Sequence, residues 1–259
     1  MRPFSLGEVF ADAGRVLRAD TPHLLAIALV LAAAAGALAL VVRLLIPFGQ
    51  PDLTTGTILI AASLVQLLIA GWIYPRFTRV ALNRLVPGQP RAVGLASWAA
   101  VMVIQSPGML PSLALYVAEA LGEPTVARML FPWGSFLWSW LLGIVFGSAT
   151  PLAIDQRLSG FSALARAFDL TRGSRLPLLG LSLLTATAYR ALLYLAVWIT
   201  LPLRAYGTGE IALLAASIVP QVLTAFLNPV VSCLQVGVYR QLWRRRTGVE
   251  PGGEAGVFG

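Results

Sequence analysis

The sequence contains no lysine, and it contains only one histidine and one cysteine. All 19 of its cationic residues are arginines, so chemistry that needs a lysine Schiff base is excluded. His23 and Cys233 are too few to form a zinc site, a histidine-paired nucleophile, a CxxC redox pair or an intrachain disulfide. We therefore expect no enzymatic activity, no metal and no cofactor.

Charged residues of either sign are also scarce. They make up 12% of the 259 residues, whereas 58% are hydrophobic and the mean hydropathy is +0.79. Soluble domains carry about 25% charged residues, so the composition is typical of an integral membrane protein. The pI near 10.7 does not indicate nucleic-acid binding, because the arginines are dispersed in short loops between apolar runs.

Six long apolar runs predict the fold. A helix needs about 20 apolar residues to cross the bilayer core of about 30 Å. Runs of that length predict an all-α membrane bundle with six spans, at about 22–47, 55–74, 96–121, 132–154, 176–203 and 211–239. The bundle is expected to be one domain over 1–246, followed by a flexible tail at 247–259. Prolines at 107, 111, 220 and 229 are expected to bend the third and sixth runs.

The arginines are distributed asymmetrically around these runs. Fifteen lie before the first run, in the loops after the second and fourth runs, and after the sixth run, whereas three lie in the other loops. Loops rich in arginine stay on the cytoplasmic side. We therefore expect a multi-pass protein of the bacterial cytoplasmic (inner) membrane with both termini in the cytoplasm.

Two amphipathic segments, at 4–20 and about 161–173, precede the first and fifth runs. Their apolar residues recur at helical spacing, and Glu8 and Asp12 fall on the opposite, polar side of the first segment. We expect helices that lie in the cytoplasmic interface, with docking of a partner protein as the alternative for the first. Anionic lipid headgroups are the expected partners, and a protein partner or a second copy of the chain stays open. The candidate headgroup contacts are Arg15, Arg18, Arg166, Arg172, Arg244, Arg245 and Arg246.

The two amphipathic segments also indicate an internal repeat. A gapless alignment of Glu8–Val30 with Ser162–Leu184 gives six identities in 23 positions. Both stretches follow the order surface helix, charge, proline, span. We expect a duplicated unit whose copies are parallel in the membrane.

Three stretches of the chain resemble a known family of bacterial membrane domains. They are FSLGEVFADAGRVLRADTPHLLAIALV, TPLAIDQRLSGFSALARAFDLTRGSRLPLLGLSLL and NPVVSCLQVGVYRQLWRRRTG. They resemble the membrane domain attached to some glycerophosphoryl diester phosphodiesterases, and the uncharacterised YciC-like multi-pass proteins. The resemblance implies a helical membrane domain without an established activity. It does not imply phosphodiesterase activity, which belongs to a separate soluble barrel.

Arg190 is a charge about halfway along the fifth run. At that depth a charge costs at least about 2.5 kcal/mol, so we expect it to bind polar partners. Gln66, Gln221 and Asn228 lie at similar depth in other runs and complete a candidate midplane site. Two interpretations stay open: a site for an anion or a lipid headgroup in a central cavity, or a structural clamp between the fifth and sixth spans.

Two functions are compatible with these features. The first is a non-enzymatic scaffold or accessory subunit that binds anionic lipid or a membrane partner. It predicts that Arg190 lies in a filled, fully hydrogen-bonded niche. The alternative is a small transporter or channel for an anionic or amphipathic solute, which predicts an open polar cavity at Arg190.

Overall fold

The computed structural model describes residues 4–45, 53–86, 91–120, 134–138, 140–143, 147–206 and 209–251. Regular structure in these ranges is helical, which agrees with the predicted all-α class. Five helices are long and apolar enough to cross a membrane: Leu6–Leu45, Thr54–Leu85, Leu95–Leu115, Arg175–Pro202 and Ile218–Thr247. The fourth predicted run, 132–154, lies partly outside the described residues.

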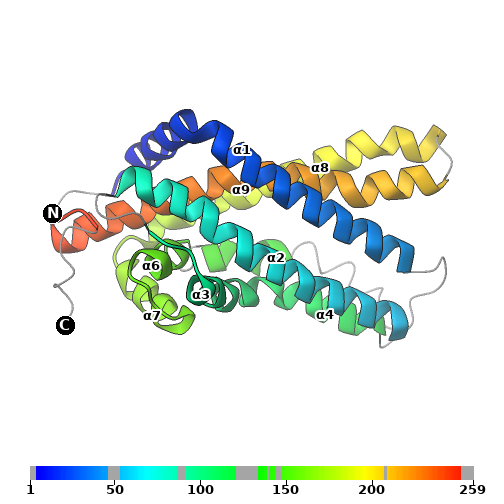
Figure 1. Ribbon diagram of the computed structural model, residues 1–259, viewed down its shortest axis with the longest axis horizontal. Coiled ribbons are helices and arrows are strands. Elements are labelled where there is room, and N and C mark those ends of the chain that lie inside the picture. Colours follow the sequence, from blue (N-terminus) through cyan, green and yellow to red (C-terminus); the bar gives the residue numbers. More distant parts are fainter. Residues whose placement is uncertain are drawn as a thin grey trace.

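The long helices run along the long axis of the molecule (Figure 1). In chain order the elements are α1 (Leu6–Leu45), α2 (Leu53–Leu85), α3 (Leu95–Gln105), η1 (Ser106–Met109), α4 (Leu110–Ala120), α6 (Ala149–Asp155), α7 (Gly160–Leu170), α8 (Arg175–Tyr206) and α9 (Gly209–Thr247). Residues 134–138 and 140–143 are also helical. We call the end that carries α6, α7 and the arginine-rich last turn of α9 the basic end (left in Figure 1).

Prolines act differently in the two runs that they were expected to bend. Pro107 lies in η1, a 3₁₀ turn that separates α3 from α4, so the third run is interrupted as predicted. Pro220 and Pro229 both lie inside α9, which continues through them as one helix of 39 residues. Proline has no backbone N–H, so each of them leaves a carbonyl one turn earlier without its usual donor.

The first amphipathic segment is the start of α1, joined to the first span through a kink at Asp20 (φ −120°, ψ 19°). Its apolar face packs against α9: Val9 and Val16 are fully buried, and a Cβ at Gly237 would lie 3.2 Å from the carbonyl oxygen of Val9. The expectation that Asp12 lies on the exposed side is wrong, since Asp12 is only 5% exposed. The physical reason is that α9 extends beyond the predicted span and offers this helix a protein surface.

The second amphipathic segment forms α7 and has two apolar faces. Gly160 and Ala167 are buried, and Gly160 approaches α3 so closely that a Cβ would lie 2.8 Å from the carbonyl oxygen of Ala100. Phe161 and Phe168, by contrast, are 76% and 49% exposed. The small residues therefore contact the bundle, while the aromatic residues point away from it.

A buried carboxylate joins three segments at the basic end. The Nε of Arg91, which follows α2, donates a hydrogen bond to Oδ1 of Asp155 at 2.6 Å. The hydroxyl of Tyr239 on α9 donates to the other carboxylate oxygen at 2.5 Å. The side chains of Asp155 and Arg91 are only 5% and 9% exposed. This network connects α6, α9 and the segment that leads into α3.

Candidate functional site

The polar residues predicted at the midplane gather around two cavities. One, about 650 Å³ in volume, lies between α1, α2, α8 and α9, and we call it the α1 cavity. The other, about 580 Å³, lies between α2, α3, η1, residues 135–136 and 142–143, α6, α8 and α9, and we call it the Arg190 cavity. Gln66 and Asn228 line both cavities, Gln221 lines the first and Arg190 lines the second. The four predicted residues therefore lie close together, but they line two adjoining cavities and not one.

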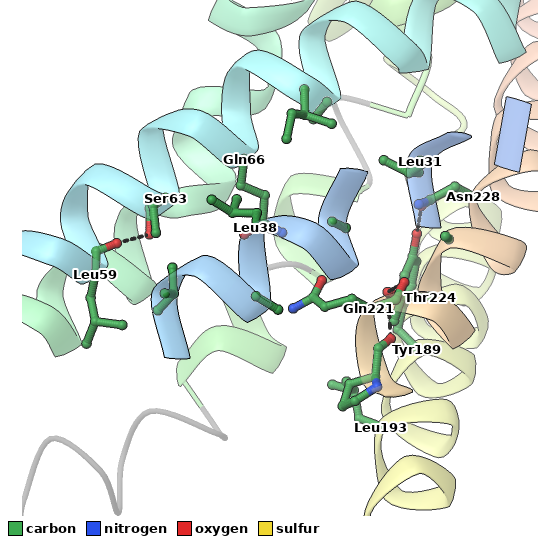
Figure 2. A pocket seen from close by; sticks show the side chains of 18 of the residues that line it. Leu31, Leu38, Leu59, Ser63, Gln66, Tyr189, Leu193, Gln221, Thr224 and Asn228 are labelled. Atoms are coloured by element: carbon green, nitrogen blue, oxygen red, sulfur yellow. Dashed lines mark hydrogen bonds between the residues drawn. The ribbon is translucent and has the colours of Figure 1, made fainter. Parts of the chain in front are cut away.

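The α1 cavity has one apolar wall and one polar wall. Leu31 and Leu38 of α1 contribute to the apolar wall, whereas Gln221, Thr224 and Asn228 of α9 form a polar strip (Figure 2). Gln66 enters from α2 (Figure 2). Both kinds of surface are thus available to one molecule in this space.

The cavity also has a cation far from the basic end. Arg43 belongs to the lining and lies in the last turn of α1. Leu59, from the N-terminal part of α2, lines the same region. The α1 cavity therefore extends away from the basic end.

The Arg190 cavity is lined by many hydroxyl and amide groups. Besides Arg190 they include Gln66, Thr78, Gln105, Ser135, Thr150, Ser182, Thr185, Asn228, Ser232 and Gln235. Thr78 is 1% exposed, and its hydroxyl makes no hydrogen bond within the described part of the chain. A buried polar group of this kind marks a place for water or for a polar ligand.

Arg190 is held by a residue that the sequence analysis did not name. Its Nη2 donates a hydrogen bond to the hydroxyl of Ser135 at 2.5 Å, and its guanidinium carbon lies 6.0 Å from the ring centre of Phe136. Both partners belong to the helical residues 134–138 of the fourth predicted run. This contact links the fifth predicted span to the fourth, whereas the clamp interpretation expected a link to the sixth.

Two tryptophan side chains near Ser135, Trp138 and Trp140, form hydrogen bonds with neighbouring elements. The Nε1 of Trp140 donates to the carbonyl oxygen of Leu179 on α8 at 3.0 Å, and the Nε1 of Trp138 donates to the carbonyl oxygen of Pro107 at 2.6 Å. These bonds give each indole N–H group an acceptor in an apolar environment. They keep the residues beside Arg190 in position.

Two tyrosines and an asparagine lie where the cavities meet. The hydroxyls of Tyr74 on α2 and Tyr189 on α8 both donate to Oδ1 of Asn228 on α9, the first at 3.3 Å. All three residues line both cavities, and Asn228 is 7% exposed. We call this group the partition. Neither tyrosine was predicted here: Tyr74 ends the second predicted run, where aromatic residues also serve as interface anchors, and Tyr189 lies in the middle of the fifth run, where periodicity does not reveal the inward face.

Most of the arginines proposed to contact lipid headgroups have protein partners. Arg15 pairs with Asp12 at 3.3 Å, Arg244 with Glu250 at 3.2 Å, and Arg166 donates to the side-chain oxygen of Gln156 at 2.9 Å. Arg245 donates to the hydroxyl of Ser174. The remaining three candidates are exposed: Arg18, Arg172 and Arg246.

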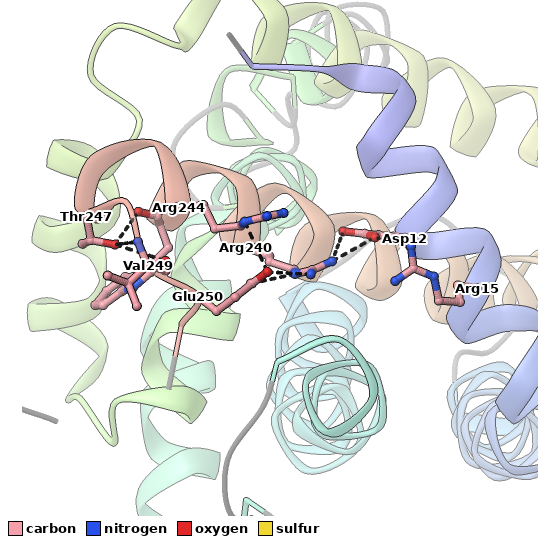
Figure 3. A network of polar contacts seen from close by, with 8 residues as sticks. Asp12, Arg15, Arg240, Arg244, Thr247, Val249 and Glu250 are labelled. Atoms are coloured by element: carbon pink, nitrogen blue, oxygen red, sulfur yellow. Dashed lines mark hydrogen bonds and ion pairs between the residues drawn. The ribbon is translucent and has the colours of Figure 1, made fainter. Parts of the chain in front are cut away.

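Arg240, which the sequence analysis did not select, is the centre of a second ion-pair network (Figure 3). Its Nη1 lies 3.1 and 3.0 Å from the two carboxylate oxygens of Asp12, and Glu250 accepts from its Nε at 2.9 Å and its Nη2 at 2.7 Å. Glu250 thus brings the residues after α9 back against that helix, whereas the flexibility expected of the tail from 247 stays a prediction; residues 252–259 lie outside the described ranges.

Comparisons with known proteins add no relative. A scan against protein-family models, a search of curated proteins and a search of solved structures each found no match. Among the described residues, no group of three or more histidine, cysteine, aspartate or glutamate side chains is arranged to hold a metal ion. The two cavities and the charges around them are therefore the features of this protein that bear on its function.

Proposed function

We propose that this chain is a six-span protein of the bacterial cytoplasmic membrane, with both termini in the cytoplasm, that binds an anionic amphipathic solute and transports it. The observation that carries the proposal is the environment of Arg190. This cation lines a polar cavity of about 580 Å³. A polar cavity of this size beside a cation supports a binding site for a solute.

The chemistry of the cavities supports this class of solute. A guanidinium stays charged at every physiological pH and presents a fork of donors that suits carboxylate and phosphate groups. Both cavities fall in the volume range of about 300–1,000 Å³ that is typical of small-molecule sites. The leucines of the α1 cavity suit a hydrocarbon chain, and its polar strip suits a headgroup.

The topology in this proposal rests on the sequence. Fifteen of the 19 arginines lie on the side that we assign to the cytoplasm. The basic end carries the last turn of α9 with Arg244, Arg245 and Arg246. The proposed parallel repeat pairs α1 with α7 and α8, and the resemblance to the phosphodiesterase-associated membrane domain fits a non-enzymatic role.

The test uses the purified chain in vesicles of phosphatidylethanolamine and phosphatidylglycerol. Native mass spectrometry of the gently extracted protein identifies bound anionic lipids or metabolites. Arg190→Gln is expected to weaken binding by about 10- to 150-fold, the range for loss of a hydrogen bond to a charged group. Arg157→Gln, at an exposed arginine that lies outside both cavities and is not a candidate headgroup contact, is the matched control. Loss of folding yield in Arg190→Gln with unchanged binding would show that the arginine is structural.

A scaffold or accessory subunit remains the second candidate, and a separate observation favours it. The aromatic residues Phe161 and Phe168 and the exposed Arg172 all project from α7 and the turn that follows it. Such a surface suits an anionic bilayer or a membrane partner, including a second copy of the chain. This candidate predicts that lipid binding depends on Arg18, Arg172 and Arg246 and is unaffected by Arg190→Gln.

A further inference from the structure

The two cavities share the partition, and each also has lining residues that the other lacks. The α1 cavity reaches Arg43 and Leu59, away from the basic end. The Arg190 cavity reaches Thr78 on α2 and Gln235 on α9, towards the basic end. Both are lined by Tyr74, Tyr189 and Asn228, together with Gln66 and Leu193. The partition is thus the region that the two spaces have in common.

We propose that the α1 cavity is a second binding site for the same anionic amphipathic solute, and that Asn228, held by Tyr74 and Tyr189, closes the path between it and the Arg190 site. This inference rests on the proposed function, because it assigns the successive positions of one solute. It adds a site and a closing residue to that function.

The composition of the α1 cavity supports the second site. Its polar strip on α9 offers amide and hydroxyl groups to a headgroup, and Arg43 supplies positive charge at the far end. Leu31 and Leu38 cover the opposite side, where a hydrocarbon chain is stable (Figure 2). A solute with an acidic head and an apolar tail matches both surfaces, as it does at Arg190.

The hydrogen bonds of the partition explain how the path is closed. The two tyrosine hydroxyls, from α2 and α8, converge on one amide oxygen of α9, so a single side chain holds three helices together. These are neutral hydrogen bonds, without an ion pair among the three groups. They are weaker than charge-assisted bonds, and a polar headgroup competes for them.

The backbone of α9 is weakened at the same place. Pro229 follows Asn228 directly and Pro220 lies two turns earlier, and each removes one backbone hydrogen bond from the helix. The hydroxyl of Thr224 also bonds back to the carbonyl oxygen of Pro220 at 2.9 Å, a contact that is associated with helix bending. Bending here would move Asn228 away from the tyrosines.

The experiment measures the access of cysteines from each side of sealed vesicles. Cys233, the single native cysteine, is fully buried and is replaced by alanine. Gln221→Cys then reports on the α1 cavity and Ala186→Cys on the Arg190 cavity. With a negatively charged, membrane-impermeant methanethiosulfonate, Gln221→Cys is expected to react at least tenfold faster from the outer side. Ala186→Cys is expected to show the opposite preference.

Opening of the partition should abolish this preference. Asn228→Ala is expected to raise the slower rate of each cysteine at least tenfold. Ser63→Ala, which alters the α1 cavity without touching the partition or α9, is the matched control and should leave both ratios unchanged. Tyr189→Phe removes one of the two hydrogen bonds and keeps the ring, so it should change the rates in the same direction even if Asn228→Ala folds poorly. Equal reaction from both sides in the native background, or unchanged rates in both partition variants, would overturn the inference.

Protection by lysophosphatidylglycerol separates the two proposals. We expect this probe to slow the labelling of both cysteines at least threefold. Protection of Ala186→Cys alone would refute the second site and leave the Arg190 site standing. A lack of protection at both cysteines with the side preference intact would refute the proposed solute, whereas the closing role of Asn228 would stand.

Discussion

Replacement of Asp155 by alanine is expected to destabilise the bundle by about 3–5 kcal/mol, the range for removal of one partner from a buried ion pair. The pair is close: the Nε of Arg91 lies 2.6 Å from Oδ1 of Asp155. The substitution also removes the acceptor of the Tyr239 hydroxyl. A guanidinium that is 9% exposed would lose this carboxylate and gain no water in exchange.

The magnitude follows from two opposing terms. With an effective dielectric constant of about 20, the attraction at 2.6 Å is about 6 kcal/mol. Desolvation costs several kcal/mol for each ion, so the intact pair contributes little net stability. Once Asp155 is gone, the desolvation of Arg91 is no longer offset. Arg91→Ala together with Asp155→Ala should therefore cost about 0.5–3 kcal/mol less than the two single substitutions added together.

Thermal unfolding in a mild detergent, followed by tryptophan fluorescence and size-exclusion chromatography, checks this prediction. For a chain of this size, about 2–4 °C of Tm per kcal/mol converts the loss into about 6–20 °C. Asp169→Ala removes an exposed aspartate of α7 and should change the stability by less than about 0.5 kcal/mol. Equal Tm values for Asp155→Ala and Asp169→Ala would refute the network as a source of stability.

Three further predictions concern packing and polar contacts. Gly160→Ala should lower the free energy of unfolding by about 1–3 kcal/mol, because the new Cβ would lie 2.5 Å from the Cβ of Val103. The control is Gly180→Ala, whose Cβ would have no atom within 4 Å. In the same unfolding assay it should be neutral or stabilising by up to about 1 kcal/mol. Asp12→Asn should weaken the attachment of the start of α1 to Arg240 by about 1.5–3 kcal/mol, because it removes the charge from two hydrogen bonds. Trypsin should then cleave faster after Arg15, and an unchanged cleavage rate would contradict this prediction. Trp140→Phe should lower the free energy of unfolding by about 1 kcal/mol, because it removes the hydrogen bond to the carbonyl oxygen of Leu179. The control is Trp198→Phe, at a side chain that is 71% exposed. An equal loss of stability in the two variants would contradict this prediction.

The helices themselves were predictable from the sequence, apart from their ends. The second apolar run was predicted to end at residue 74, whereas α2 continues to Leu85. Hydropathy marks the residues that are stable in hydrocarbon, and it does not mark where the helix stops. Arginine is a good helix former, so α2 continues through Arg76, Arg79 and Arg84 after its apolar part has ended.

The candidate site was predictable in part. Gln66, Arg190 and Asn228 were recognisable because polar residues inside apolar runs are rare and expensive. Ser135 and Tyr189 were not recognised as their partners. In helices whose lipid and protein faces are both apolar, periodicity does not reveal which face turns inward. Asp12 was placed on the wrong side of its helix for another reason: α9 extends beyond the predicted span and brings Arg240 to it.

Which segments are apolar and helical, and how the arginines are shared between the loops, follow from the chain alone, because they depend on neighbouring residues and on transfer into hydrocarbon. The pairing of polar groups depends on packing. Asp12 meets Arg240 across 228 positions, and Asn228 meets two tyrosines from different helices. These meetings depend on how each helix is rotated against its neighbours, and only the folded bundle sets that rotation, through close contacts such as the one between Val9 and Gly237.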